Sequence, residues 1–231
     1  GFKGSIVHVN DLIENPKMLI QFQVLSFPGG FSYGDDTGSG NAMANKIRNN
    51  LFDHLSKFLM KDKLVIGICN GCQILVNLGI VPTLDSTARE VALVENDSAV
   101  YQCRWINLKI SNDYSPWLTG IKKMYLPVAH QEGKFMISKA VKQELINNNL
   151  IACQYVDEKG QLAKQIFPYN PNGSDLDIAA LTNAKGNVLA MMPHPERAYY
   201  FTHEPNWQDK KNQSKYADGY KIFKNARKYF K

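Results

Sequence analysis

Leu64-Val65-Ile66-Gly67-Ile68-Cys69-Asn70-Gly71-Cys72-Gln73-Ile74-Leu75 is the stretch that decides the fold. Residues 64–68 form an apolar, β-branched run between polar neighbours, which is typical of a buried strand. Residues 71–78 have a helical composition, and Gly79 stands where a helix commonly ends. The stretch therefore predicts a strand that turns directly into a helix.

The turn carries the pattern Gly67-x-Cys69-x-Gly71, which is the nucleophile elbow with cysteine in place of serine. Neighbouring backbone crowds the positions two before and two after the nucleophile, so both need small residues. The turn projects Cys69 into the cleft beyond the strand end, where open α/β sheets bind ligands. It also places the thiol at a helix N-terminus, which favours the thiolate. Cys69 is therefore predicted to be a nucleophile.

Two other interpretations of Cys69 remain open at this point. A cysteine beside an apolar strand is usually a buried small hydrophobe. The spacing Cys69-x-x-Cys72 also fits a redox pair. The two glycines at elbow spacing favour the nucleophile, and the redox interpretation is the weaker one because Asn70-Gly71 already serves the turn.

Composition bounds the class of protein. A chain of 231 residues with 44% hydrophobic and 21% charged residues is an ordinary globular chain with a substantial core. No apolar run approaches the roughly 20 residues of a membrane helix, so no membrane association is expected. The four cysteines form no disulfide framework, which favours a reducing, cytoplasmic setting. A net charge of +6 permits an anionic partner but does not establish nucleic-acid binding, and none is expected.

The remaining chain alternates between apolar runs and turn signals. Strands are expected at residues 5–9, 22–27, 90–94, 100–110, 124–130, 134–138, 150–155, 178–182 and 187–192, the last two as a hairpin. Helices are expected at 41–60, 71–78, 140–146 and 216–230.

His194 and Glu196 are the second chemical feature, in the segment Pro193-His194-Pro195-Glu196. A thiol that attacks a carboxamide needs a base that takes its proton and later delivers it to the leaving ammonia, and histidine does this near neutral pH. A carboxylate then holds the imidazole in one tautomer. Residues two apart on an extended segment project to the same side. Alone the segment is more often a structural loop, but beside the elbow it predicts a Cys-His-Glu triad.

These motifs together resemble the class I (triad) glutamine amidotransferases. Further segments are more narrowly similar to the glutaminase part of phosphoribosylformylglycinamidine (FGAM) synthase, the fourth step of purine biosynthesis. They are Pro28–Asp35 (PGGFSYGD), Pro127–Gly133 (PVAHQEG), Asn170–Ser174 (NPNGS) and Met191–Arg197 (MMPHPER). The resemblance spans most of the chain and implies an α/β fold with a doubly wound, mostly parallel sheet flanked by helices and an added antiparallel β portion.

The resemblance also implies a mechanism and its residues. Cys69 would form a γ-glutamyl thioester with L-glutamine, His194 would be base and then acid, and Glu196 would orient His194. Backbone N–H groups at Asn70 and Gly30 would hold the oxyanion, and Gln73 would contact the substrate. His130 and Glu132 match a segment of the family but receive no role.

The ammonia would pass to an FGAM synthase synthetase subunit or domain that uses ATP and magnesium. Neither cofactor is expected in this chain, and no metal site, because it has no phosphate-binding Gly-x-x-x-x-Gly-Lys-Ser/Thr loop. We expect one domain over residues 1–231. The first strand–helix unit of the family, on the order of 30 residues, is expected before residue 1. A standalone subunit and a C-terminal domain of a fused enzyme both remain open.

The alternatives come from other classes. One is the glutaminase of another biosynthetic amidotransferase. Another is a cysteine hydrolase of the dienelactone-hydrolase or intracellular-protease type, which needs the elbow but not Gln73 or His-Pro-Glu. A third is a non-catalytic scaffold of the same fold, against which the intact Cys69, His194 and Glu196 argue.

Overall fold

The structure is a computed structural model of the whole chain, and it describes residues 1–82, 91–112, 114–210 and 214–231. The strands are β1 (Val24–Phe27), β2 (Leu64–Ile68), β3 (Val91–Val94), β4 (Gln102–Ile110), β5 (Lys123–His130), β6 (Lys134–Ile137), β7 (Ile151–Val156), β8 (Ile178–Thr182) and β9 (Val188–Met191). The α-helices are α1 (Val9–Glu14), α2 (Asn41–Met60), α3 (Asn70–Asn77), α4 (Lys139–Asn147) and α5 (Tyr220–Tyr229).

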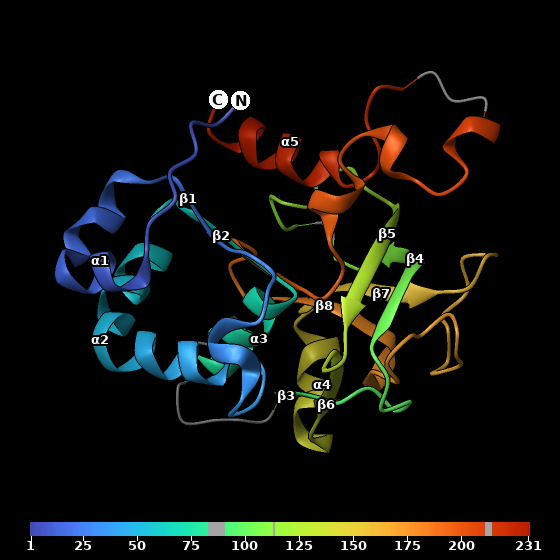
Figure 1. Cartoon of the computed structure of the whole chain (residues 1–231), viewed down its shortest axis with the longest axis horizontal. Coiled ribbons are helices and arrows are strands. Elements are labelled where there is room, and N and C mark those ends of the chain that lie inside the picture. The colour runs from blue at the N-terminus through green and yellow to red at the C-terminus, as the bar shows by residue number, and fades with distance from the viewer. Residues whose placement is uncertain (83–90, 113, 211–213) are drawn as a thin grey trace.

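A seven-stranded sheet in the order β1-β2-β9-β8-β7-β4-β5 forms the centre of the molecule (Figure 1). Strands β1, β2 and β9 pair in parallel, and the four pairings from β9 to β5 are antiparallel. Five of the seven strands nevertheless run in the direction of β2, because β8 and β4 alone are reversed. The expected α/β class with an added antiparallel portion is confirmed, and four of the six strand pairings in this sheet are antiparallel.

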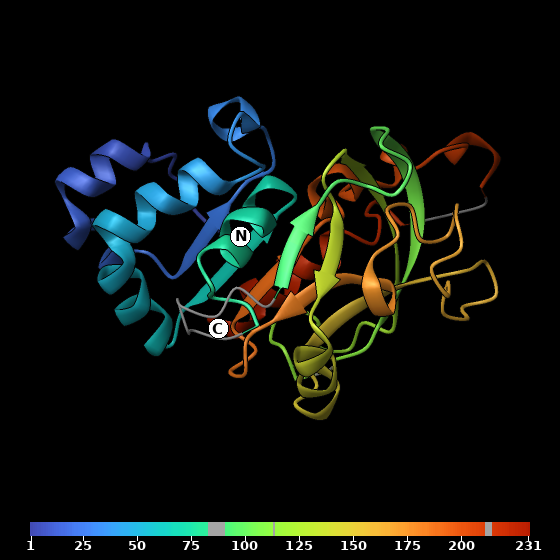
Figure 2. The ribbon, with the colours of Figure 1, turned by 90° about the horizontal axis from the view of Figure 1, so that it is seen from below.

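Helices flank the parallel part of the sheet. Helix α3 packs on β1, β2 and β9, and α2 packs on α3. Helix α5 lies on the other side of β2 from α3 (Figures 1 and 2). Every residue of β2, β8 and β9 is buried, as strands covered on both faces require. Strands β3 and β6 form a separate antiparallel pair.

The elbow is built on two close backbone approaches. A Cβ atom on Gly71 would lie 2.0 Å from the carbonyl oxygen of Phe27 in β1, and one on Gly67 would lie 2.5 Å from the carbonyl oxygen of Gly71. Between them Cys69 adopts φ 51° and ψ −106°, outside the usual regions for a residue with a side chain. The predicted end of the helix at Gly79 is also confirmed, because Gly79 has φ 76°.

Residues 5–9 are not a strand, so that prediction is wrong. Val9 begins α1, and residues 5–8 belong to no element. Residues 6–9 and Leu25–Phe27 line the same cavity of about 640 Å³ instead of pairing with each other. Backbone groups of an extended segment need a neighbouring strand, and the sequence pattern does not show whether one is in reach.

The other expected elements are present with shifts at their ends. The C-terminal helix begins at Tyr220 rather than at residue 216, and α1 lies where no helix was expected. Glu90, the first residue of the expected strand 90–94, lies outside the described residues. None of the helices in the described ranges is long and apolar enough to cross a membrane.

The elbow geometry predicts the cost of a single methyl group. We expect Gly71→Ala to lower the free energy of unfolding by about 2–4 kcal/mol, because the new Cβ would force α3 away from β1. Denaturant unfolding followed by circular dichroism measures this change. The matched control is Gly4→Ala, whose Cβ would have no atom within 4 Å. An equal effect of the two substitutions would contradict the close approach at Gly71.

Candidate active site

Cys69 lies between β2 and α3, at the carboxyl end of the parallel strands. It is 6% exposed, and its Sγ donates to the carbonyl oxygen of Ala129 at 3.6 Å. Burial raises the pKa of the thiol to about 11, although a hydrogen bond from the backbone of Asn70 and the charge of Arg197 lower it. The start of α3 does favour the thiolate, through the backbone of Asn70, but burial outweighs this effect. A base is needed to ionise Cys69 at neutral pH.

His194 follows β9, and its backbone N–H donates to the carbonyl oxygen of Pro127 in β5 at 2.8 Å. The residue is 1% exposed. Its Nδ1 lies 2.6 Å from Oε1 of Glu196, which stands in the 3₁₀ helix Pro195–Ala198. Since a carboxylate only accepts, Nδ1 carries the proton and Nε2 keeps a lone pair. That Nε2 is buried and has no hydrogen-bond partner among the described residues.

Cys69 and His194 come together because β2 and β9 are parallel neighbours. Ile68 pairs with Met191, and the backbone N–H of Cys69 donates to the carbonyl oxygen of Met191 at 2.8 Å. Both side chains border the position that a side chain on Gly29 would occupy. A Cβ on Gly29 would lie 3.5 Å from Cβ of Cys69 and 2.9 Å from Cε1 of His194. The structure thus brings together the three residues that the sequence singled out as a triad.

Gly30 and Asn70 directly follow the two residues, Gly29 and Cys69, that meet at this point. Gly30 has φ 147°, which favours glycine, and a Cβ there would have no atom within 4 Å. The side chain of Asn70 accepts from the backbone of Ser32 at 3.3 Å and donates to Asp35 at 3.2 Å, which ties the segment after Gly30 to α3. The backbone N–H of Asn70 hydrogen-bonds the thiol. Two backbone segments therefore meet beside the nucleophile, as an oxyanion hole requires.

The side chain of Gln73 is held by other protein groups. Its Nε2 donates to the carbonyl oxygen of Glu132 at 2.6 Å, and its Oε1 accepts from Asn70 at 3.0 Å. The carboxylate of Glu132 accepts in turn from the backbone of Ser39 at 3.1 Å. Gln73 therefore links α3 to the segment after β5, and its contact with a substrate stays a prediction.

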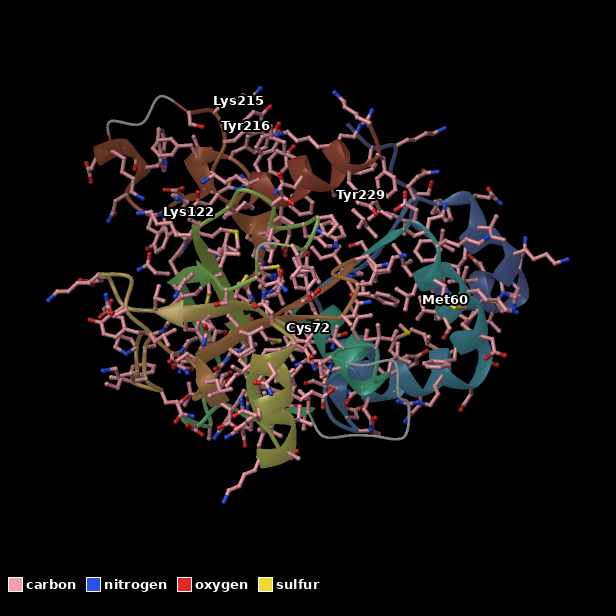
Figure 3. The ribbon with its side chains drawn as sticks, turned by 180° about the vertical axis from the view of Figure 1, so that it is seen from behind. Met60, Cys72, Lys122, Lys215, Tyr216 and Tyr229 are labelled. Carbon is pink, nitrogen blue, oxygen red and sulfur yellow. The ribbon has the colours of Figure 1, made fainter. Side chains whose placement is uncertain are left out.

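Cys72 is a core residue in this structure. It is fully buried, and Figure 3 shows it in the interior of the molecule. Burial raises the pKa of its thiol well above the ordinary value, and Cys69 and Cys72 are both free. A redox pair needs an accessible thiolate, so the geometry disfavours the redox interpretation. The described ranges contain no group of three or more His, Cys, Asp or Glu side chains placed to hold a metal ion.

His130 and Asn96 are the residues whose importance the sequence did not settle. His130 ends β5, 2% exposed, directly after the residue whose carbonyl accepts from Cys69. Its Nδ1 lies 3.1 Å from Oδ1 of Asn96. The resemblance had singled out the segment around His130 without giving it a role. Nothing in the sequence pointed to Asn96, which lies in a loop far from His130 along the chain.

The whole chain matches one family of known proteins. Residues 1–230 match the model of the CobB/CobQ-like glutamine amidotransferase domain. The chain therefore belongs to the CobB/CobQ-like glutamine amidotransferases.

Particular relatives narrow the comparison. The chain is 43% identical to phosphoribosylformylglycinamidine synthase subunit PurQ of Methanococcus maripaludis, over 100% of this chain and 89% of the relative. It is 39% identical to the subunit PurQ of Dehalococcoides mccartyi, over 99% of this chain and 88% of the relative. The solved structure of PurLQS from Thermotoga maritima superposes with a TM-score of 0.64 and 30% identity, over 91% of this chain and 81% of that chain.

The raised pKa of Cys69 predicts how its alkylation depends on pH. Only the thiolate reacts, so below a pKa of about 11 the rate with iodoacetamide rises about tenfold per pH unit. We expect that slope from about pH 7 to pH 9.5, measured by peptide mass spectrometry without substrate. Cys103, which is exposed, is the internal reference for an accessible thiol. A rate at Cys69 that is already level at neutral pH would show a stabilised thiolate instead.

Proposed function

We propose that this chain is the glutaminase component of phosphoribosylformylglycinamidine synthase in de novo purine biosynthesis. The observation that carries the catalytic assignment is that Cys69 and His194 both lie beside Gly29, with Nδ1 of His194 on Glu196. The relatives named PurQ and the PurLQS structure support the choice of pathway.

The reaction begins with ionisation of Cys69. Nε2 of His194 takes the thiol proton, and Sγ attacks the side-chain carbonyl carbon of L-glutamine. The N–H groups of Gly30 and Asn70 stabilise the negative oxygen of the tetrahedral intermediate. The carbon–nitrogen bond then breaks, and the proton on Nε2 goes to the nitrogen, which leaves as ammonia.

Water completes the cycle. His194 takes a proton from the water that attacks the γ-glutamyl thioester. The carbon–sulfur bond then breaks to release glutamate, and the proton passes from Nε2 to Sγ, which restores the thiol of Cys69. Glu196 keeps Nδ1 as the donor through both halves, because its oxygen lies 2.6 Å away and accepts only. Gln73 positions the substrate through its place between α3 and Glu132.

The ammonia requires a second active site. We infer that it passes to a synthetase subunit or domain that amidates formylglycinamide ribonucleotide with ATP and magnesium, neither of which this chain has a motif to bind. The four cysteines are free, which agrees with a reducing, cytoplasmic setting.

A reactive glutamine analogue tests the proposed chemistry directly. We expect 6-diazo-5-oxo-norleucine to add once per chain, on the peptide that contains Cys69, and excess glutamine to protect it. Intact and peptide mass spectrometry measure the adduct with and without a synthetase partner. Labelling of Cys72, Cys103 or Cys153 instead would remove the basis of the catalytic assignment.

Cys69→Ala separates an enzyme from a scaffold. With the synthetase present, we expect the variant to lose glutamine-dependent product formation completely and to keep ammonia-dependent formation, because the partner's site is untouched. Product and glutamate are measured in the same assay, with the exposed Cys103→Ala as the matched control. Glutamine-dependent synthesis by Cys69→Ala would instead favour a non-catalytic scaffold.

Glu196→Gln tests the tautomer of His194. The amide still fills the space but no longer stabilises an imidazolium, so we expect kcat to fall about a hundredfold or more. The KM for glutamine should change much less, since Glu196 is placed to contact His194 rather than the substrate. Steady-state glutaminase kinetics measure both values. An unchanged kcat would show that Glu196 is not the orienting group.

A further inference from the structure

Nε2 of His130 is a buried polar atom with no partner among the described residues. The residue is 2% exposed, and a buried acceptor without a partner costs about 1–3 kcal/mol of stability. Such atoms in a folded protein call for an explanation, and a ligand that completes the hydrogen bond is one. Nε2 of His194 is in the same condition, and the mechanism already explains it.

Asn96 fixes the tautomer of His130. Its Nδ2 donates to the carbonyl oxygens of Val100 at 3.0 Å and His130 at 2.9 Å, so the nitrogen end of the amide is settled. Its Oδ1 accepts from the backbone N–H of Gly133 at 3.2 Å and faces Nδ1 of His130 at 3.1 Å. Nδ1 must therefore be the donor, which leaves the lone pair on Nε2.

The ring of His130 is held in place and neutral. A Cβ on Gly133 would lie 2.3 Å from two atoms of the ring, so the chain closes tightly over it. Burial, and next the nearby positive charge that His194 carries when protonated, lower the pKa of His130 to about 4. At neutral pH Nε2 is therefore an acceptor and cannot donate.

The position of His130 connects it with the reacting atoms. The preceding carbonyl, of Ala129, accepts from the thiol of Cys69, and the carbonyl of Glu132 holds Gln73. The charge that His194 carries when protonated is near enough to lower the pKa of His130. The segment from Ala129 to Glu132 thus lies beside the nucleophile. The group that leaves in the proposed reaction is a nitrogen that carries two N–H bonds.

We propose that Nε2 of His130 accepts one N–H of the glutamine side-chain amide and holds that nitrogen as it departs. This inference rests on the proposed glutaminase function. As the Sγ–carbon bond forms and the carbon–nitrogen bond breaks, the nitrogen receives the proton from Nε2 of His194 and leaves as neutral ammonia. His130 gains and loses no proton and acts by accepting a hydrogen bond.

Two substitutions of His130 distinguish the contributions of its two ring nitrogens. His130→Asn keeps a donor near Nδ1 for Asn96 and removes the acceptor, whereas His130→Gln places an amide oxygen near the position of Nε2. Glutamate γ-methyl ester is the second substrate, because it forms the same thioester but its leaving group has no N–H. A role in folding or in placing His194 would affect both substrates alike.

The expected result is a loss specific to the amide. In the full chain with its synthetase partner, His130→Asn should lower kcat/KM for glutamine about ten- to a hundredfold and for the ester less than about threefold. His130→Gln should restore most of the glutamine activity. Asn112→Ala, a buried polar change beyond the far end of β4, is the control and should alter neither substrate selectively.

Three outcomes would overturn the proposal. They are an equal loss on both substrates, no loss on either, and a His130→Gln variant no better than His130→Asn. Thermal unfolding of each variant shows whether an equal loss reflects misfolding. Failure of the proposed function itself looks different, because the unmodified chain would then hydrolyse neither substrate and 6-diazo-5-oxo-norleucine would not label Cys69.

Discussion

The approach of Gly71 to the backbone of β1 is the constraint on which the rest of the structure depends. With only 2.0 Å between the place of a Cβ and the carbonyl oxygen of Phe27, α3 can begin against β1 only where no side chain exists. This contact sets the direction of α3 and forces Cys69 to φ 51°. Such backbone strain costs about 1–3 kcal/mol and is maintained by the buried strands around it. The strain holds the thiol at the junction between strand and helix.

The site is assembled from the ends of strands that are distant in sequence. Parallel pairing of β2 with β9 places Cys69 beside the segment of His194, and the turn after β1 supplies Gly29 and Gly30. The antiparallel portion closes the other side, because the end of β5 contributes Ala129 and His130. The two halves of the sheet thus have different tasks. The parallel strands position Cys69 and His194, and the antiparallel strands supply the carbonyl of Ala129 and the ring of His130.

The sequence correctly predicted those strands and helices whose own residue pattern shows which of their faces is buried. The run 64–68 is apolar throughout and becomes a buried strand, and the spacing of residues 41–60 becomes α2. Residues 5–9 have an equally good strand pattern but pair with nothing, because pairing depends on a neighbour that the pattern does not specify. Cys69, His194 and Glu196 were recognisable because elbow and triad chemistry need fixed residue types. Asn96 was not, since a buried asparagine has meaning only once its four partners are known.

Electrostatics explains why two buried ring nitrogens of the site have no hydrogen-bond partner among the described residues. The two ring nitrogens without partners, on His130 and His194, cost about 2–6 kcal/mol together, against a typical total stability of 5–15 kcal/mol. Burial keeps Cys69 protonated and His130 neutral at neutral pH. A glutamine amide brings a carbonyl oxygen for the backbone donors and N–H groups for the free acceptor. In the proposed complex, the glutamine amide thus supplies the hydrogen bond that folding left open at Nε2 of His130.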